Sequence, residues 1–220
     1  MTEIEAIRAR HAVRNYTAKP LSPEIIDELS QEIEQCNRQG QLHIQLVTEN
    51  GEAFKSMIPL FGRFKNVKNY IALAAKKQGD FYVKCGYCGA RLMVKAQQAG
   101  LNSCWVTNTY NAKKCPVTLA PDEELVGVIA IGYGTTDGTQ HKSKNMERLC
   151  KPCSDKWFTD GMNAAVLAPT GLNRQNFFIE ANGNTVSIRT KDNHPMSQIN
   201  TGIVKYHFEV GAGRENFIWK

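Results

Sequence analysis

The chain has 220 residues, of which 42% are hydrophobic, so it is long enough to bury a substantial core as one large domain or two small ones. Its formal net charge of +6 comes from cations spread along the chain without a dense basic tail, which favours small anionic ligands over nucleic acid. The N-terminus lacks an apolar signal core, no stretch approaches the roughly 20 apolar residues of a membrane helix, and the cysteine count of seven is odd. We therefore expect a cytoplasmic protein with reduced thiols and no membrane contact.

In the first part of the chain, apolar spacing predicts a short amphipathic helix over residues 3–11. Ser22 followed by Pro23 predicts the start of a second helix, because serine caps a helix and proline suits its first position. Alternating apolar and polar residues predict a strand over residues 42–48, and a short apolar run predicts a buried strand over residues 70–75.

Further along, the longest helix is predicted over residues 81–99, with Gly100 as its C-terminal cap. Asn182-Gly183 is a typical turn between two predicted strands of a hairpin. The other elements expected in this part are strands over 103–106 and 125–132, a loop over 132–144, helices over 156–167 and 198–210, and the hairpin strands over 176–181 and 185–190.

The alternation of helices and strands predicts an α+β fold, in which a mostly antiparallel central sheet is flanked by helices as in an α/β sandwich. A three-residue motif that occurs twice suggests two related halves, and we call it the Asn-Arg-Gln echo. Asn37-Arg38-Gln39 and Asn173-Arg174-Gln175 each precede a predicted strand that ends in Asn-Gly. The alternative is chance, because each match is short.

Four segments resemble the nitroreductase family. Residues 7–16, IRARHAVRNY, are similar to its N-terminal signature, in which two basic residues flank a small residue or His and a Ser or Ala. Residues 168–178, APTGLNRQNFF, are similar to the family's A-P-S-x-x-N-x-Q-P-W-x-F loop. Residues 100–106 and 61–65 resemble the family's strand at the flavin edge and its loop under the cofactor. The resemblance covers most of the chain and implies the family fold and FMN as cofactor.

Three departures qualify this resemblance. The A-P-T-G loop lies in the second half, whereas in dimeric members it lies near the N-terminus and serves the partner's flavin; the chain thus resembles a single-chain subfamily. We expect residues 1–154 to form a flavin-binding half that residues 155–220 complete, in a monomer with pseudo-dimeric halves or in a homodimer. Asn176 and Phe177 replace the loop's Pro and Trp, and Ala12 replaces a Ser, which removes a hydroxyl contact.

The resemblance assigns Arg10 and His11 to the phosphate and ribityl end of FMN and Arg14 to the pyrimidine edge, with Lys142 and Lys144 closing on the phosphate. A guanidinium can fork onto phosphate, and Arg10 and Arg14 share a helical face if the helix continues. The alternatives are a solvated helix face for the arginines and a charged surface loop for the lysines. The other implied cofactor contacts are Ala12, Gly62, Lys65, Trp105, Val106, Thr107, Pro169, Thr170, Gly171, Asn173 and Gln175.

These residues imply hydride transfer from NAD(P)H through FMN to a small electrophilic acceptor such as a nitroaromatic or a quinone. A backbone N–H aimed at flavin N5 suffices, so no catalytic side chain is named. One alternative is a Zn or Fe–S protein, or a nucleic-acid-binding protein, because Cys85-x-x-Cys88 and Cys150-x-x-Cys153 have ligand spacing. The pairs lie far apart and the first lies in a predicted helix, so we expect no metal. Another alternative is an FMN protein without turnover.

Overall fold

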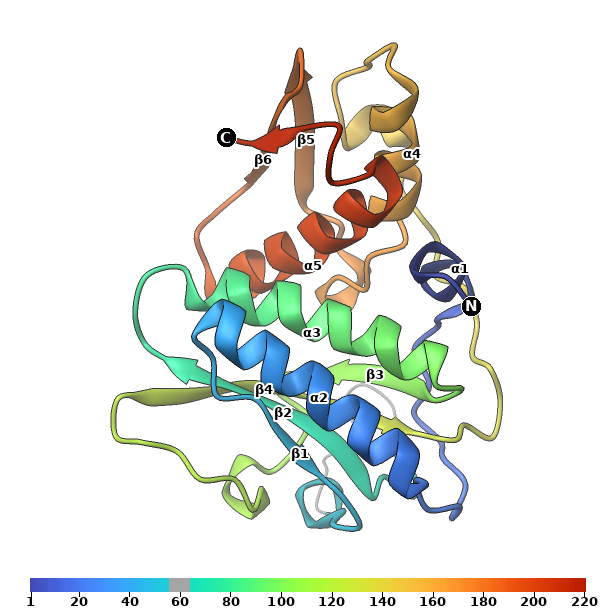
Figure 1. Cartoon of the computed structure of the whole chain (residues 1–220), viewed down its shortest axis with the longest axis vertical. Coiled ribbons are helices and arrows are strands. Elements are labelled where there is room, and N and C mark those ends of the chain that lie inside the picture. Colours follow the sequence, from blue (N-terminus) through green and yellow to red (C-terminus); the bar gives the residue numbers. More distant parts are fainter. Residues whose placement is uncertain (56–63) are drawn as a thin grey trace. The chain divides into compact units, whose positions relative to one another are not determined.

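The computed structural model describes residues 1–55 and 64–220, which divide into two compact units. The sheet unit consists of residues 9–81 and 92–140, and the hairpin unit consists of residues 1–8, 82–91 and 141–220. Helices combine with largely antiparallel sheets, which confirms the α+β class (Figure 1). Among the described residues, no helix has both the length and the apolar character that crossing a membrane requires.

The sheet unit is built on four antiparallel strands in the order β1-β2-β4-β3. All of β2 except its last residue is buried, as expected for a central strand covered on both faces. Strand β3 lies at an edge, so one side of its backbone is free to pair with another segment. The strands are β1 Gln45–Val47, β2 Asn69–Lys76, β3 Asn102–Val106 and β4 Glu123–Gly132, joined by short helices η1 Glu52–Phe54 and η2 Ala112–Lys114.

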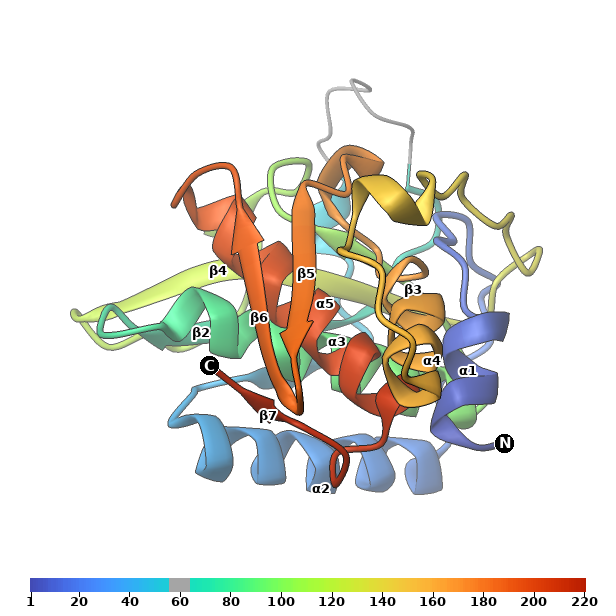
Figure 2. The same cartoon turned by 90° about the horizontal axis from the view of Figure 1, so that it is seen from above.

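Helix α2, Pro23–Gly40, covers one face of this sheet (Figures 1 and 2). The Ser22 side chain accepts from the Ile25 N–H at 3.4 Å, which confirms the predicted start. A buried cluster combines residues of β2, β3 and β4 with residues of η1 and of the segment after α1. Its members include Val13, Tyr16, Phe54, Tyr70, Ala72, Val106, Val128 and Ala130.

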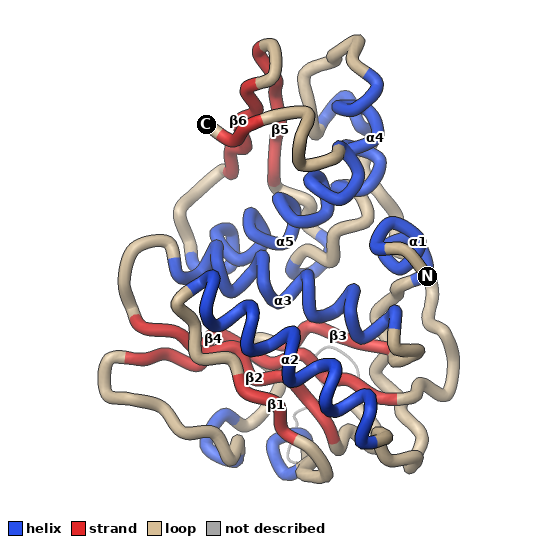
Figure 3. Tube along the Cα trace, in the orientation of Figure 1, coloured by secondary structure: helices blue, strands red, loops and turns tan. Residues whose placement is uncertain are grey.

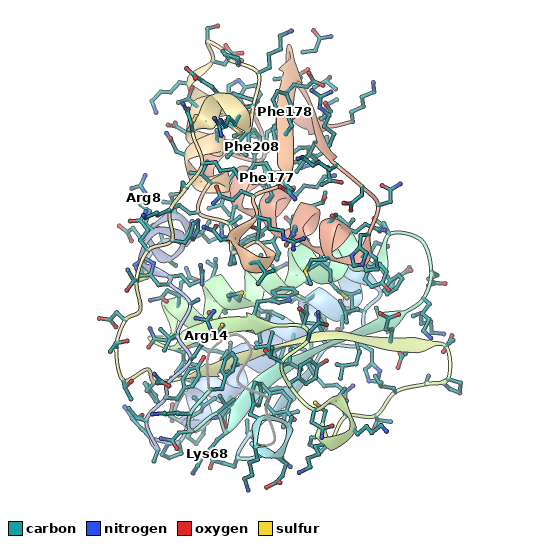
Figure 4. The ribbon with its side chains drawn as sticks, turned by 180° about the vertical axis from the view of Figure 1, so that it is seen from behind. Arg8, Arg14, Lys68, Phe177, Phe178 and Phe208 are labelled. Atoms are coloured by element: carbon teal, nitrogen blue, oxygen red, sulfur yellow. The ribbon has the colours of Figure 1, made fainter. Side chains whose placement is uncertain are left out.

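The hairpin unit combines two packed helices with a three-stranded sheet, β5-β6-β7 (Figure 3). Helices α4 and α5 approach closely because Gly211 has no side chain: a Cβ there would lie 2.5 Å from the Asp160 carbonyl oxygen. Phe208 on α5 lies in the aromatic core of this unit, 5.1 Å from Phe217 between ring centroids (Figure 4). The elements are α1 Glu3–Ala9, η3 Met146–Arg148, α4 Lys156–Ala165, η4 Gly171–Asn173, β5 Phe177–Asn182, β6 Thr185–Thr190, α5 Pro195–Ala212 and β7 Ile218–Trp219.

Helix α3, Phe81–Gln98, gives its first half to the hairpin unit and its second half to the sheet unit. Its first half contacts α5 backbone to backbone. A Cβ on Gly202 would lie 1.9 Å from the Val83 carbonyl oxygen, and a Cβ on Gly86 would lie 2.1 Å from that of Ile199. Only glycine fits at these two positions.

Several predicted boundaries are corrected. The first helix ends at Ala9, the first strand shortens to residues 45–47, and the last helix begins at Pro195. Strand β7 was not predicted, because its two residues form a strand only through their parallel pairing with β6. The Asn-Arg-Gln echo is not a structural repeat: residues 37–39 lie inside α2, whereas residues 173–175 lie in a loop with left-handed backbone.

Candidate functional site

The segment after Ala9 is extended and fills the free edge of β3. The Val13 N–H donates to the Ser103 carbonyl oxygen at 3.1 Å, and the Lys65 N–H donates to the Arg14 carbonyl oxygen at 2.9 Å. These bonds compete with helical ones, which explains why α1 stops at Ala9. The prediction that Arg10 and Arg14 share a helical face is therefore wrong, because both lie on extended chain.

Arg10 is the most unusual polar residue of the sheet unit. Its side chain is only 3% exposed, and its Nε and Nη1 atoms have no hydrogen-bond partner within the described part of the chain. Burial lowers the pKa of Arg10 to about 10, so the group stays charged at neutral pH. A buried cation without an anionic partner is costly, and an anionic ligand would supply the missing partner.

The Cys104 thiol, which interacts electrostatically with Arg10, does not neutralise it. Burial raises the pKa of the Cys104 thiol, an effect that Arg14 and Arg10 only partly offset, so Cys104 is a neutral thiol at neutral pH. The Ser103 hydroxyl is fully buried and also finds no partner among residues 1–55 and 64–220. Two unsatisfied donor groups, one of them charged, thus lie on adjoining segments of chain.

The remaining predicted residues of the sheet unit differ in exposure. Arg14, labelled in Figure 4, is exposed, as are Ala12 and Lys65. His11 is half-buried under Gly138, where a Cβ would lie 3.0 Å from the His11 Cβ. Of the predicted residues in this unit, Gly62 lies outside the described residues.

Trp105, Val106 and Thr107 end strand β3 and continue into a loop. The indole Nε1 of half-buried Trp105 is itself buried and has no partner in the described ranges. Val106 is 3% exposed and belongs to the buried cluster of the sheet, so its side chain has a packing role. Val106 can therefore contact a ligand only through its backbone.

In the hairpin unit, the structure brings the predicted lysine pair to the A-P-T-G loop. The Gln175 amide group donates to the Lys142 carbonyl oxygen, and the Lys144 N–H donates to Gln175 Oε1, each at 2.9 Å. The Asn173 amide group also donates to the Lys142 carbonyl oxygen, at 2.9 Å. The sequence predicted the lysine segment and the A-P-T-G loop as two separate cofactor contacts, whereas the structure joins them in one hydrogen-bonded cluster.

The two lysines differ within this cluster. The Lys144 ammonium donates to the carbonyl oxygens of Arg174 and Gln175, the latter at 3.3 Å, and to Asn176 Oδ1 at 3.5 Å. The ammonium of exposed Lys142 makes no hydrogen bond or ion pair with any described residue. Lys142 is therefore the member of the pair with a free charge.

The loop itself has an uncommon backbone. Leu172, Asn173 and Gln175 have φ angles of 52°, 52° and 45°, in the left-handed region that side chains other than Asn rarely adopt. The Thr170 hydroxyl accepts from the Gln175 N–H at 3.1 Å, and Asn200 Oδ1 accepts from the Gly171 N–H at 3.0 Å. Such strained backbone persists only where its surroundings hold it.

None of the seven cysteines, all of which lie in the described part of the chain, forms a disulfide. Cys85, Cys88 and Cys150 are buried, and Cys153 is half-buried. Within the described residues, no group of three or more His, Cys, Asp or Glu side chains is arranged to hold a metal ion.

Sequence reasoning missed Ser103, Cys104, Gly138 and Asn200, which support the predicted residues. Ser103 and Cys104 lie in a predicted strand whose pairing with residues 12–13 is not local. No local signal connects Asn200 with Gly171, because they are brought together only by the tertiary fold.

The family model described as "Putative TM nitroreductase" matches residues 3–212, nearly the whole chain. The chain belongs to this nitroreductase family, which confirms the resemblance seen in its sequence and supports an oxidoreductase function. No curated protein gives a significant sequence match.

Solved structures show the same fold. A Thermotoga maritima protein described as a putative nitroreductase has a TM-score of 0.66 at 20% identity, over 98% of this chain and 85% of that one. A Parabacteroides distasonis protein described as a putative NADH dehydrogenase/NAD(P)H nitroreductase has a TM-score of 0.55 at 20% identity, over 67% of this chain and 95% of that one. A Desulfovibrio desulfuricans putative nitroreductase in complex with FMN has a TM-score of 0.55 at 14% identity, over 70% and 99%.

Proposed function

We propose that this chain binds FMN and uses it to transfer a hydride from NAD(P)H to a small electrophilic acceptor such as a nitroaromatic or a quinone. The observation that carries the proposal is the buried Arg10 guanidinium, whose Nε and Nη1 have no partner among the described residues. The phosphate of FMN is a compact dianion that a guanidinium binds through two parallel hydrogen bonds. The FMN complex of the Desulfovibrio neighbour agrees with this choice.

Each set of residues has a defined part in this proposal. Arg10 pairs with the phosphate, and Ser103 offers a second buried donor on the adjoining strand. Arg14 is exposed and charged, which suits the pyrimidine edge, where reduction leaves negative charge on the flavin. In the hairpin unit, Lys142 offers a free ammonium for the phosphate. The hypothesis that both sets serve one flavin, within the chain or across a dimer, stays a prediction.

Bound FMN supplies two-electron hydride chemistry that no amino-acid side chain offers. The chain's own residues bind the cofactor, fix its orientation and exclude water from it. No side-chain acid or base is needed for the hydride itself, and we assign none. The name of the Parabacteroides neighbour is consistent with NAD(P)H as the donor.

Reconstitution tests this function directly. The purified protein is incubated with excess FMN, freed of unbound cofactor and examined for visible flavin absorbance. Steady-state oxidation of NADH and NADPH is then measured with and without a quinone. We expect retained flavin and acceptor-dependent oxidation. Absence of flavin together with no acceptor-dependent oxidation would overturn the proposal, and retained flavin without oxidation would indicate a binding protein instead.

A further inference from the structure

The inference concerns Lys144, which the family resemblance places on the cofactor phosphate. An ammonium group has three N–H donors. In this chain Lys144 faces three acceptors of one loop: the carbonyl oxygens of Arg174 and Gln175, and Asn176 Oδ1 at 3.5 Å. A phosphate could bind this ammonium only by displacing these contacts.

The segment that carries Lys144, residues 141–144, is itself held in place by hydrogen bonds. The His141 ring Nε2 lies 3.0 Å from the Val166 carbonyl oxygen, and the Ser143 hydroxyl donates to the same oxygen at 3.2 Å. The Lys144 N–H donates to Gln175 Oε1 at 2.9 Å. The residues around Lys144 are thus tied to the end of α4 and to the loop through their backbone and short side chains, which directs the Lys144 stem along the loop.

Residues 170–176 need to be held by neighbouring groups because part of their backbone is left-handed. Leu172 and Gln175 have positive φ angles although neither is glycine or asparagine. Leu172 is also 64% exposed, so burial of its own side chain does not hold it there. The carbonyl oxygens that Lys144 binds belong to Gln175 and to the residue before it, which is where the left-handed stretch ends. A charged donor at these oxygens favours this backbone over relaxed alternatives.

We propose that Lys144 is a positioning residue that holds residues 170–176 in their left-handed conformation, and that Lys142 alone of the pair meets the cofactor phosphate. The role of Lys142 rests on the proposed function, whereas the clamp by Lys144 does not. The same cluster explains why the two lysines have different roles. The amide groups of Asn173 and Gln175 donate to the Lys142 carbonyl oxygen, and the Lys142 ammonium makes no hydrogen bond with the described residues.

The first test compares FMN with riboflavin, which has the same ring but no phosphate. Lys142→Met should weaken FMN binding roughly tenfold or more, as loss of a charged hydrogen bond implies, and leave riboflavin binding unchanged. Lys144→Met should weaken both ligands by the same factor, because it disturbs the loop rather than the phosphate contact. Lys144→Arg, which keeps cationic donors, should recover part of the loss. Weakening of FMN alone by Lys144→Met would overturn the proposal.

The second test needs no cofactor. Hydrogen exchange is followed in the flavin-free protein for peptides covering residues 170–176, where the Asn173 and Arg174 N–H groups donate to the carbonyl oxygens of Thr170 and Gly171 at 2.9 and 3.1 Å. Lys144→Met should accelerate this exchange severalfold, and the matched Lys142→Met should leave it at the wild-type rate. Equal rates in Lys144→Met and wild type would overturn the clamp. If the wild type binds no flavin, the proposed function fails while this measurement still decides the clamp.

Discussion

Replacing Arg10 with methionine should stabilise the flavin-free protein and weaken FMN binding at the same time. Arg10 is 3% exposed, and two of its nitrogen atoms have no partner among the described residues. Methionine has a similar length and no charge, so it removes an unpaired buried cation without opening a large cavity.

The magnitude follows from the pKa of Arg10. Burial lowers it from 12.5 to about 10, and each pKa unit corresponds to about 1.4 kcal/mol, so the charged form costs the fold about 3.5 kcal/mol. Replacement of buried ionic groups by apolar ones stabilises proteins by about 1–4 kcal/mol where it has an effect. We expect Arg10→Met to raise the free energy of unfolding of the flavin-free protein by about 1–3 kcal/mol. Loss of two charged hydrogen bonds should weaken FMN binding by about 3 kcal/mol or more.

Urea unfolding of the flavin-free protein and fluorescence titration with FMN measure the two effects. Arg14→Met is the matched control, because Arg14 lies on the same extended segment but is exposed; its stability should stay within about 0.5 kcal/mol of wild type. With saturating FMN the wild type should become more stable than Arg10→Met, because only the wild type gains full stabilisation from the ligand. A flavin-free Arg10→Met protein that is less stable than wild type would refute the reasoning, since it would show that Arg10 has a stabilising protein partner.

The same variant has a defined pH dependence. The pKa of Arg10 is lower in the folded than in the unfolded state, so below about pH 10 both states carry the proton and the penalty is fully present. Above about pH 10 the folded state releases its proton first, and wild-type stability rises relative to Arg10→Met. The difference between the two proteins should be constant from neutral pH to about pH 9 and shrink above pH 10. A difference that changes around neutral pH would assign the effect to another group.

Three further predictions concern cofactor identity, chain completeness and metal. Cofactor released from reconstituted protein by heat should be FMN by chromatography, even when FAD is offered in equal amount; FAD would contradict a phosphate-sized site. A chain ending at Cys153 lacks α5 and leaves the α3 surface around Val83 and Gly86 uncovered, so it should aggregate and hold no flavin; a soluble fragment that binds FMN like the whole chain would refute a contribution from residues 154–220. Elemental analysis should find no stoichiometric zinc or iron, and about one metal per chain, lost on changing Cys85 and Cys150 to serine, would reverse that view.

Local signals predicted the elements that local chemistry determines. Ser22 caps α2 as expected, and Gly100, with a φ of 78°, follows the end of α3. The predicted strands 176–181 and 185–190 pair as a hairpin. The first strand extends to Asn182, so the turn consists of Gly183, which has a positive φ, and Asn184 instead of the predicted Asn182-Gly183. In each case the deciding interaction lies within a few residues of the signal.

The candidate site residues stay predictions, but the structure shows that the environment of several of them differs from what their sequence spacing suggests. The helical spacing of Arg10 suggested a solvated face, whereas the structure ends the helix at Ala9, pairs Val13 with the distant Ser103 and buries the Arg10 side chain. The lysine pair was predicted as two equivalent phosphate ligands, and only the tertiary contacts with Arg174 and Gln175 distinguish Lys144 from Lys142. These differences arise between segments far apart in sequence, which periodicity does not register.

Anaerobic mixing of the FMN-reconstituted protein with NADH or NADPH tests the central claim most directly. The visible flavin absorbance should bleach with one equivalent of nicotinamide oxidised per bound flavin, and adding a quinone should restore the absorbance as the quinone is reduced. Arg10→Met at the same concentrations should hold little flavin and give little bleaching. If the wild type retains FMN and its absorbance does not change with either nicotinamide, the chain is not an NAD(P)H-dependent oxidoreductase.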